Sequence, residues 1–185
     1  MKFLTYLAEK NKQPSFGFKL NDLIIDIRRS AEWINKDQGN EKFLTIPNDL
    51  KSTISDWNHF FPILQEMEEI VKSCDLSEIS NSEPDLQILP PIINPPAFRD
   101  FYAFEQHVRA ARKLRGLEMH PDWFQIAIFY FSNQNCCFGH GQDIPYPSNT
   151  TELDFELEFA IIIGNGGSNI KAGDAEKVIA GYTIL

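Results

Sequence analysis

The stretch TELDFELEFAIII, from Thr151 to Ile163, alternates apolar and acidic residues up to its aliphatic end. Strict period-two alternation predicts a half-buried β-strand, because successive side chains of a strand point to opposite faces. Four carboxylates then share one face, about 7 Å apart along the strand: those of Glu152, Asp154, Glu156 and Glu158. Such a row of like charges is unfavourable unless something compensates for it.

Three interpretations of this acidic row are open. It is a solvated outer face, a surface that flanks a basic partner, or a site for a hard cation. An exposed strand face usually mixes the signs of its charges, which the row does not. Mg²⁺ and Ca²⁺ prefer carboxylate oxygens, and either cation would relieve the repulsion. A divalent-metal site is therefore one hypothesis for this strand.

Composition narrows the class of protein. The chain has 185 residues, of which 43% are hydrophobic, enough for a sizeable core. Its net charge of −9 argues against nucleic acid as a partner, since phosphate binding needs a basic surface. The N-terminal MKFLTYLAEK lacks the features of a signal peptide, and the apolar run Phe159–Ile163 is too short to span a bilayer. We expect a soluble cytoplasmic protein with no membrane partner.

The first half of the chain predicts a small α/β unit. Strands are expected over residues 1–7 and 16–27, joined by a polar turn around residues 10–15. Helices are expected over 30–37 and 49–73, with Pro62 breaking or restarting the second. A proline-rich connector follows, and we place a domain boundary near residue 90.

The second half begins with a predicted amphipathic helix over residues 99–119. Asp100 is its candidate N-cap, Gly116 its candidate stop, and Glu105 and Arg109 are spaced to pair. A strand over 124–133 and a turn-rich loop over 136–149 are expected before the acidic strand. A hairpin-type turn over 164–169, a short helix and a last strand complete the chain.

Asp100 and His107 form a candidate pair on the predicted helix. Seven residues make two helical turns, so the two side chains would share one helix edge, about 10 Å apart, with the small Ala103 between them. Taken singly, Asp100 is interpreted as an N-cap and His107 as a surface or core histidine. Taken together, and near a metal, His107 is a candidate general base at neutral pH.

Cysteine usage offers little further chemistry. Cys136, Cys137 and His140 suggest a soft-metal site, but adjacent cysteines lack the spacing of a zinc knuckle and no second pair exists. With Cys74 the count is odd, which makes a poor disulfide framework.

The order of several blocks resembles the fumarylacetoacetate hydrolase family. These blocks are RDFYAFEQH, IFYFSN, IPYP, LDFELEFAIIIG and IAGYTIL, within residues 90–185. The resemblance implies an α+β, mainly β, fold in which a mixed β-roll catalytic domain, incomplete here, follows a small α/β N-terminal domain. The expected domains are residues 1–90 and 91–185. The family is usually homodimeric, so we expect a homodimer.

The resemblance also implies a site. Asp100, Glu156 and Glu158 match the family's ligands for Mg²⁺ or Ca²⁺, and His107 matches its general base. Tyr102 and Tyr130 match substrate contacts. In fumarylacetoacetases proper an arginine falls nine residues after the histidine, where this chain has Gly116. Arg115 and Arg112 lie nearby, and Arg115 is our candidate for that role.

The implied activity is hydrolysis of a carbon–carbon bond in a small β-diketo acid of the fumarylacetoacetate or acylpyruvate type, a step of aromatic amino acid catabolism. The resemblance is also compatible with a decarboxylase, hydratase or isomerase of 2-oxo acids within the same family, or with an inactive metal-binding fragment. The family pattern continues beyond GYTI with a block that supplies a fourth metal ligand, whereas this sequence ends at Leu185. We therefore expect the 185 residues alone to be inactive or weakly active.

Overall fold

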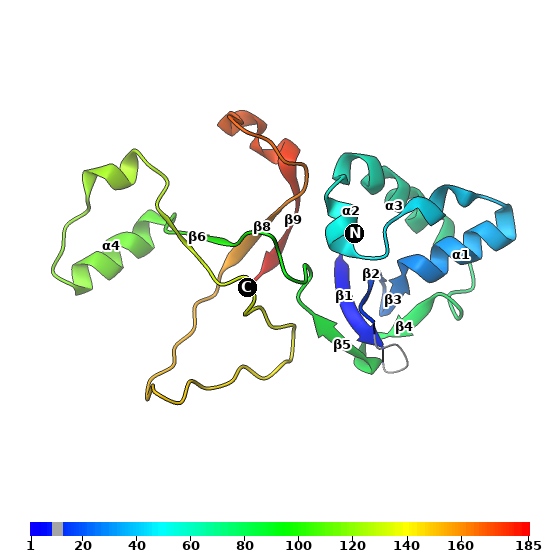
Figure 1. Cartoon of the computed structure of the whole chain (residues 1–185), viewed down its shortest axis with the longest axis horizontal. Helices are drawn as coiled ribbons and strands as arrows, with labels where there is room; N and C mark the ends of the chain where they lie inside the picture. The colour runs from blue at the N-terminus through cyan, green and yellow to red at the C-terminus, as the bar shows by residue number, and fades with distance from the viewer. Residues whose placement is uncertain (9–12) are drawn as a thin grey trace. The chain divides into compact units, whose positions relative to one another are not determined.

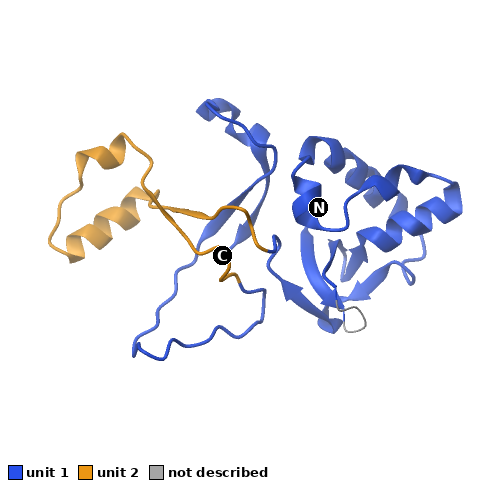
Figure 2. Ribbon diagram, in the orientation of Figure 1, with its two compact units in different colours: residues 1–93, 138–185 blue, residues 94–137 orange. Residues whose placement is uncertain are grey.

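A computed structural model describes residues 1–8 and 13–185, which form two compact units (Figure 2). Unit 1 comprises residues 1–93 and 138–185, and unit 2 comprises residues 94–137. The chain contains both helices and strands, so the protein belongs to the mixed α and β class. The β-roll and the division at residue 90 stay predictions.

Unit 1 is built on a five-stranded antiparallel sheet with the order β4-β3-β2-β1-β5. The strands are β1 (Phe3–Ala8), β2 (Ser15–Leu20), β3 (Leu23–Asp26), β4 (Ser80–Ser82) and β5 (Leu86–Leu89). The single strand predicted over residues 16–27 is thus two strands. They are joined by a tight turn in which Asn21 has a φ of 55°. The predicted polar turn falls partly on residues 9–12, outside the described residues.

Three α-helices lie against this sheet (Figure 1): α1 (Ile27–Gln38), α2 (Leu50–Ile54) and α3 (Trp57–Val71). Asp26 starts α1, because its Oδ1 accepts a hydrogen bond from Arg29 N at 2.9 Å, and Gly39 ends it with a φ of 65°. Phe18, Ile34 and Leu64 are fully buried between the layers. Short 3₁₀ helices occur at Glu41–Thr45 and Glu83–Asp85.

The helix predicted over residues 49–73 is interrupted, but not at Pro62. The interruption lies at Ser55 and Asp56, between α2 and α3, whereas Pro62 lies inside α3. The prediction of a break at Pro62 is therefore wrong. Proline removes one helix hydrogen bond, and the burial of Leu64 and Met67 just beyond it offsets that loss.

The rest of unit 1 contributes a two-stranded antiparallel sheet, β8 (Phe159–Ile163) with β9 (Ile179–Ile184), the latter preceded by a 3₁₀ helix at Ala172–Val178. Ile162 and Ala180 pack against the core of unit 1. The hairpin loop also meets the start of α3, where Asn165 Oδ1 accepts a hydrogen bond from Trp57 N at 3.1 Å. At Gly164 the approach is close, since a Cβ there would lie 3.1 Å from the Cβ of Trp57.

The acidic strand is much shorter than predicted. Only Phe159–Ile163 is a strand, and the ladder extends one residue further through two hydrogen bonds, of 2.8 and 2.9 Å, between the backbones of Glu158 and Leu185. No described strand lies beside residues 151–157, and Phe155 is 86% exposed. The prediction of a strand over residues 151–158 is wrong because alternation forms a strand only where a neighbouring strand pairs with it.

Unit 2 contains a two-stranded antiparallel sheet and one α-helix. Strand β6 (Arg99–Phe101) pairs with β7 (Phe129–Phe131), and α4 (Glu105–Leu114) and a 3₁₀ helix at Pro121–Phe124 lie between them in sequence. The strand predicted over 124–133 is therefore reduced to its centre. No helix among the described residues of either unit is long and apolar enough to cross a membrane.

Candidate active site

The antiparallel pair β6–β7 places Asp100 directly opposite Tyr130. Residues opposite one another in an antiparallel pair project from the same face of the sheet. Asp100 is half-buried and Tyr130 is 61% exposed. One face of this small sheet therefore carries a carboxylate, which can ligate a hard cation, beside a phenol, which can donate a hydrogen bond.

The opposite face of β6–β7 is aromatic. The Arg99 guanidinium lies 3.9 Å from the centre of the Phe131 ring, and the Phe101 and Phe129 rings lie 5.1 Å apart. A cation stacked on an aromatic ring and a pair of packed rings stabilise the strand pairing. This packing fixes which face of the sheet Asp100 and Tyr130 occupy.

Asp100 therefore belongs to a strand and not to a helix. The predicted N-cap role is wrong, since α4 begins at Glu105 and Phe104 holds its N-cap position. The predicted geometry, Asp100 and His107 on one helix edge, is wrong for the same reason. Residues 99–101 form a strand because they pair with β7. That partner lies far along the chain, so local periodicity does not indicate it.

Tyr102 and His107 are in contact across the connection from β6 to α4. Their ring centres lie 5.8 Å apart with an interplanar angle of 85°, an edge-to-face arrangement. Tyr102 is fixed by its backbone, because its N–H donates to the Ile128 carbonyl at 3.0 Å and its carbonyl accepts from Trp123 Nε1 at 2.8 Å. Sequence reasoning missed Trp123, whose contact with Tyr102 spans 21 residues and leaves no local pattern.

Arg115 lies next to the same tyrosine. Its guanidinium donates to the Tyr102 hydroxyl at 3.5 Å, and its Nε donates to the Ala111 carbonyl at 3.1 Å. The helix ends here as predicted, since Gly116 has a φ of 70° and its N–H donates to the Lys113 carbonyl at 3.0 Å. The structure thus brings Tyr102, His107 and Arg115 together within unit 2.

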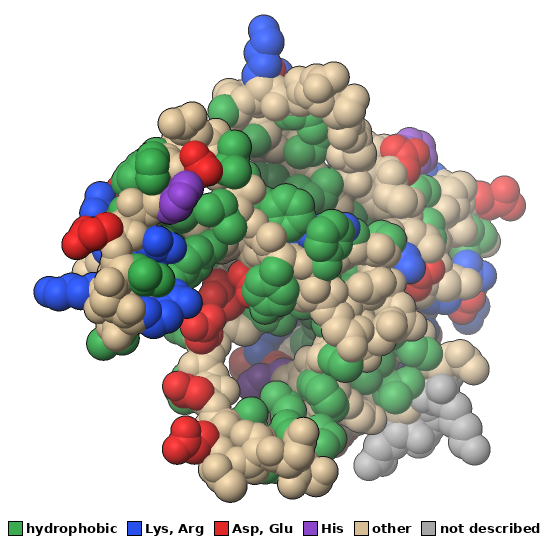
Figure 3. Space-filling view, turned by 60° about the vertical axis from the view of Figure 1, so that its left-hand side comes forward, with side chains coloured by type: hydrophobic (Ala, Val, Ile, Leu, Met, Phe, Trp, Pro, Cys, Tyr) green, Lys and Arg blue, Asp and Glu red, His purple; other side chains and the backbone are tan. Residues whose placement is uncertain are grey.

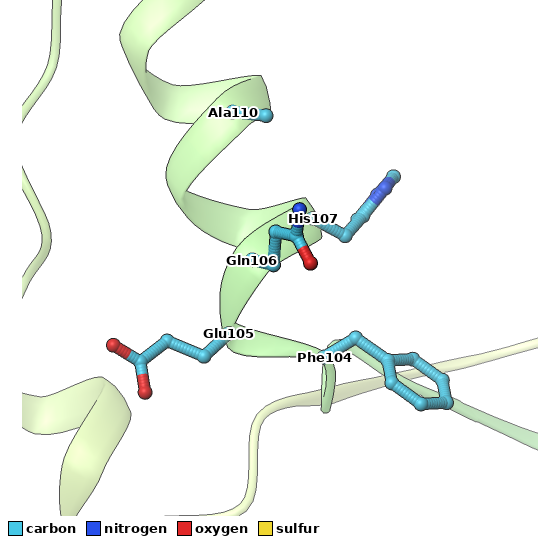
Figure 4. Close-up of a pocket in the computed structure, with 5 residues that line it drawn as sticks. All are labelled: Phe104, Glu105, Gln106, His107 and Ala110. Atoms are coloured by element: carbon cyan, nitrogen blue, oxygen red, sulfur yellow. The ribbon is translucent and has the colours of Figure 1, made fainter.

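An open hollow of about 580 Å³ lies along α4 beside His107 (Figure 4). It is lined by Phe104, Glu105, Gln106, His107 and Ala110. The His107 and Phe104 side chains project to one side in Figure 4, and Glu105 projects to the other. Glu105 pairs with Arg109 at 2.6 Å, which confirms the predicted ion pair. The exposed His107 ring is thus open to a ligand.

The two predicted glutamate ligands belong to unit 1. Glu158 is half-buried beside β8, and Glu156 is exposed two residues earlier. Asp100 belongs to unit 2, so the assembly of the predicted ligand set, Asp100, Glu156 and Glu158, stays a prediction. Within the described residues no three His, Cys, Asp or Glu side chains form a metal-holding group.

The donor chemistry of these three residues nevertheless fits a hard cation. All three supply carboxylate oxygens, the ligands that Mg²⁺ and Ca²⁺ prefer. Among the described residues, none of the three carboxylates takes part in an ion pair with a basic side chain. Their negative charge is therefore not neutralised by protein groups that the structure describes.

The chain is similar to proteins of known family. A family model described as the C-terminal domain of fumarylacetoacetate (FAA) hydrolase matches residues 97–185. The fumarylacetoacetase of Oryza sativa subsp. japonica is 31% identical over 144 residues, covering 67% of this chain and 32% of that protein. The fumarylacetoacetase of Arabidopsis thaliana is 26% identical over 217 residues, covering 97% of this chain and 50% of that protein.

A shorter similarity is to a protein with a different activity. A mitochondrial oxaloacetate tautomerase of Homo sapiens is 39% identical over 46 residues, covering 25% of this chain and 15% of that protein. The matches span at most half the length of the fumarylacetoacetases. On the match over residues 97–185 and on these relatives, the chain belongs to the fumarylacetoacetate hydrolase family.

Proposed function

We propose that the protein is a divalent-metal-dependent hydrolase that cleaves a carbon–carbon bond in a small β-diketo acid. The observation that carries this proposal is that His107 and Arg115 both contact Tyr102 in unit 2. His107 lies against the Tyr102 ring, and Arg115 donates to its hydroxyl. A base, a phenol and a guanidinium at one place suit an anionic substrate whose reaction begins with removal of a proton from water. The two plant fumarylacetoacetases among its relatives support a hydrolase of this class.

Asp100, Glu156 and Glu158 are the proposed ligands of Mg²⁺ or Ca²⁺. When bound, the cation would polarise the carbonyl that is attacked and stabilise the negative charge of the departing carbon. The cation site would also reduce the repulsion between an acidic substrate and a protein with a net charge of −9. In this proposal the unpaired carboxylates of the acidic row acquire a function.

His107 would take a proton from water through a nitrogen of its exposed ring. The resulting hydroxide would attack the carbonyl carbon, and the bond between that carbon and the neighbouring methylene would break. The proton held by His107 would then pass to the methylene carbon, so that the products are a carboxylic acid and an oxo acid, which is a 2-oxo acid from an acylpyruvate and a 3-oxo acid from fumarylacetoacetate. Tyr102, Arg115 and Tyr130 would hold the substrate's carboxylate and keto oxygens.

A second candidate is isomerisation of a 2-oxo acid. The match to a human oxaloacetate tautomerase favours it, since that match is 39% identical over 46 residues. Tautomerisation needs the same base and the same enolate stabilisation, but no attacking water. Decarboxylation or hydration of a 2-oxo acid would draw on the same base and cation, whereas an inactive fragment would retain cation binding alone.

We also propose that the protein is a cytoplasmic homodimer.

Cation binding by the 185-residue chain tests the metal assignment directly. We expect Glu156→Ala to abolish Ca²⁺ binding in a calorimetric titration, because it removes a ligand oxygen. Glu152→Ala is the matched control, since it removes an equal charge four residues away from the same exposed segment. Equal affinities of the two variants would show that the site is not at Glu156.

Product analysis tests the reaction. The 185-residue chain, for which we expect at most weak activity, would be incubated with Mg²⁺ and a panel of fumarylacetoacetate, acylpyruvates and oxaloacetate, and the products separated by chromatography. Release of a carboxylic acid and an oxo acid supports hydrolysis, and we expect His107→Ala to lower kcat by about 10²–10⁴-fold. Interconversion of keto and enol forms without cleavage would instead establish the second candidate.

A further inference from the structure

Two adjacent thiols, those of Cys136 and Cys137, follow β7 and end unit 2. The proposed hydrolase site gives them no role. Both are free, Cys136 is exposed and Cys137 is half-buried, so reagents in solution have access to the pair. Cys74, the other cysteine of the chain, is also free but has no cysteine neighbour in sequence.

Both sulfur atoms lie against the same turn. The Cys136 N–H donates to the Asn133 carbonyl at 3.2 Å, which closes the turn. The Asn133 side-chain amide donates to Cys136 Sγ at 2.9 Å, and Cys137 Sγ donates to the Gln134 carbonyl at 3.7 Å. The two sulfurs thus contact neighbouring residues of one turn, and they belong to side chains on adjacent Cα atoms, about 3.8 Å apart.

Two common fates of cysteine pairs fit this geometry poorly. Adjacent Cα atoms lie about 3.8 Å apart, below the usual range of about 4.4–6.8 Å for a disulfide, so a bond between these two sulfurs would be strained. Structural zinc needs four ligands, and no three His, Cys, Asp or Glu side chains form such a group in the part of the chain that the structure describes.

The protonation of Cys137 favours a reaction that can start from neutral thiols. Burial, and after it the neighbouring Cys136, raises the pKa of the Cys137 thiol. Ionising Cys137 is therefore unfavourable near neutral pH, which disfavours acceptors that require its thiolate. A reagent that condenses with two thiols and releases water avoids this cost.

We propose that Cys136 and Cys137 form a dithiol site for trivalent arsenicals. In the reaction, R–As(OH)₂ and two thiols give R–As(S–Cys)₂ and two molecules of water. Two arsenic–oxygen bonds break, two arsenic–sulfur bonds form, and both thiol protons leave in the water. Arsenic stays trivalent and sulfur is not oxidised, so no oxidant is required.

The advantage of the pair is that its second bond forms within the molecule. Once one sulfur holds arsenic, the adjacent thiol is present at a millimolar or higher effective concentration. An isolated thiol such as Cys74, whose Sγ lies 3.1 Å from the Ile70 carbonyl, lacks this second step. Adjacency, and not thiol exposure alone, therefore determines the affinity.

Titration of the 185-residue chain with phenylarsine oxide tests the site. We expect one equivalent to bind, to resist a monothiol and to be removed by ethane-1,2-dithiol. Cys136→Ser and Cys137→Ser should each weaken binding by about 10²–10⁴-fold, the gain expected from linking two bonds. Cys74→Ser is the matched control and should bind like wild type. Wild-type affinity in either single variant of the pair would overturn the proposal.

A second measurement needs no variant and so does not depend on how the variants fold. The wild-type chain would be treated with one equivalent of phenylarsine oxide, alkylated, and analysed by peptide mass spectrometry. Simultaneous protection of Cys136 and Cys137, with Cys74 alkylated, is the expected result. Alkylation of Cys136 and Cys137 in the arsenical-treated chain would refute the dithiol site, because a bridged pair has no free thiol.

Discussion

Tyr6 shows how one residue of the N-terminal sheet connects several elements. Its side chain is fully buried, its hydroxyl donates to Asp26 Oδ2 at 2.7 Å, and it accepts from Asn81 Nδ2 at 3.2 Å. Asp26 also caps α1 through its other oxygen, at 2.9 Å from Arg29 N. One phenol thus connects β1, the start of α1 and β4.

Replacing Tyr6 with phenylalanine keeps the ring and removes both hydrogen bonds. We expect Tyr6→Phe to lower the free energy of unfolding by about 1–3 kcal/mol, because Asp26 and Asn81 lose a buried partner. Urea denaturation followed by circular dichroism measures the change. Tyr182→Phe is the control, since Tyr182 is 55% exposed and stacks on Phe159, and its stability should stay within about 0.5 kcal/mol of wild type.

The raised pKa of Tyr6 predicts that the protein loses stability at alkaline pH. Burial, followed by the Asp26 charge, raises the pKa of Tyr6 in the folded state, whereas in the unfolded chain it is about 10. Above that pH the unfolded state binds fewer protons than the folded state, so the stabilisation from Tyr6 is present below about pH 10 and is lost above it. The free energy of unfolding should fall more steeply above about pH 10 in wild type than in Tyr6→Phe. If the free energy of unfolding of the two proteins fell equally steeply above that pH, Tyr6 would not be the group responsible.

At the scale of elements, α3 lacks an N-cap from its own sequence. Asp56 occupies the cap position but makes no side-chain capping hydrogen bond. Asn165, from the β8–β9 loop, instead accepts from Trp57 N at 3.1 Å. The first turn of the helix is therefore completed by a residue 108 positions away, in the same loop as Gly164. This contact fixes β8, the strand that follows Glu158, to the N-terminal layer.

Removing the Asn165 side chain should expose this dependence. We expect Asn165→Ala to destabilise the chain by about 0.5–2 kcal/mol, the usual cost of losing an N-cap, and to speed hydrogen exchange of the Trp57 amide. Asn165→Asp keeps an acceptor oxygen at the helix N-terminus and should restore both properties. If the aspartate variant exchanges as fast as the alanine variant, the cap does not hold the two elements together.

Local patterns predicted the elements that local interactions determine. The helix around residues 30–37, the Glu105–Arg109 ion pair and the stop at Gly116 are all confirmed, because each depends on residues at most four apart or on one backbone conformation. The strand at Asp100 was missed because its partner lies 30 residues along the chain. Trp123 and Asn165 were missed for the same reason: their contacts with Tyr102 and Trp57 leave no periodic signal.

At the scale of the whole molecule, charge and apolar surface act in opposite directions. The net charge of −9 disfavours association of two copies. Yet β8–β9 presents an apolar face, since Phe159, Ile161, Tyr182 and Ile184 are each between 51% and 67% exposed and share one side of the hairpin. Figure 3 shows hydrophobic side chains reaching the surface of the molecule at many places. Contiguous exposed apolar surface favours association, and unpaired sheet edges add to this tendency.

We therefore expect the 185-residue chain to associate in solution, and to do so more strongly as salt is added. Salt screens the repulsion between two chains of charge −9 and leaves apolar contact intact, so the sign of the salt effect separates this mechanism from association through ion pairs. Sedimentation velocity at low and high salt measures this association.

Ile161→Lys places a charge at the centre of the β8–β9 face and should shift the chain toward monomer. Leu114→Lys is the control, because Leu114 is 90% exposed on α4, outside that face. Equal dissociation by both variants would mean that added charge alone, and not the β8–β9 face, governs assembly.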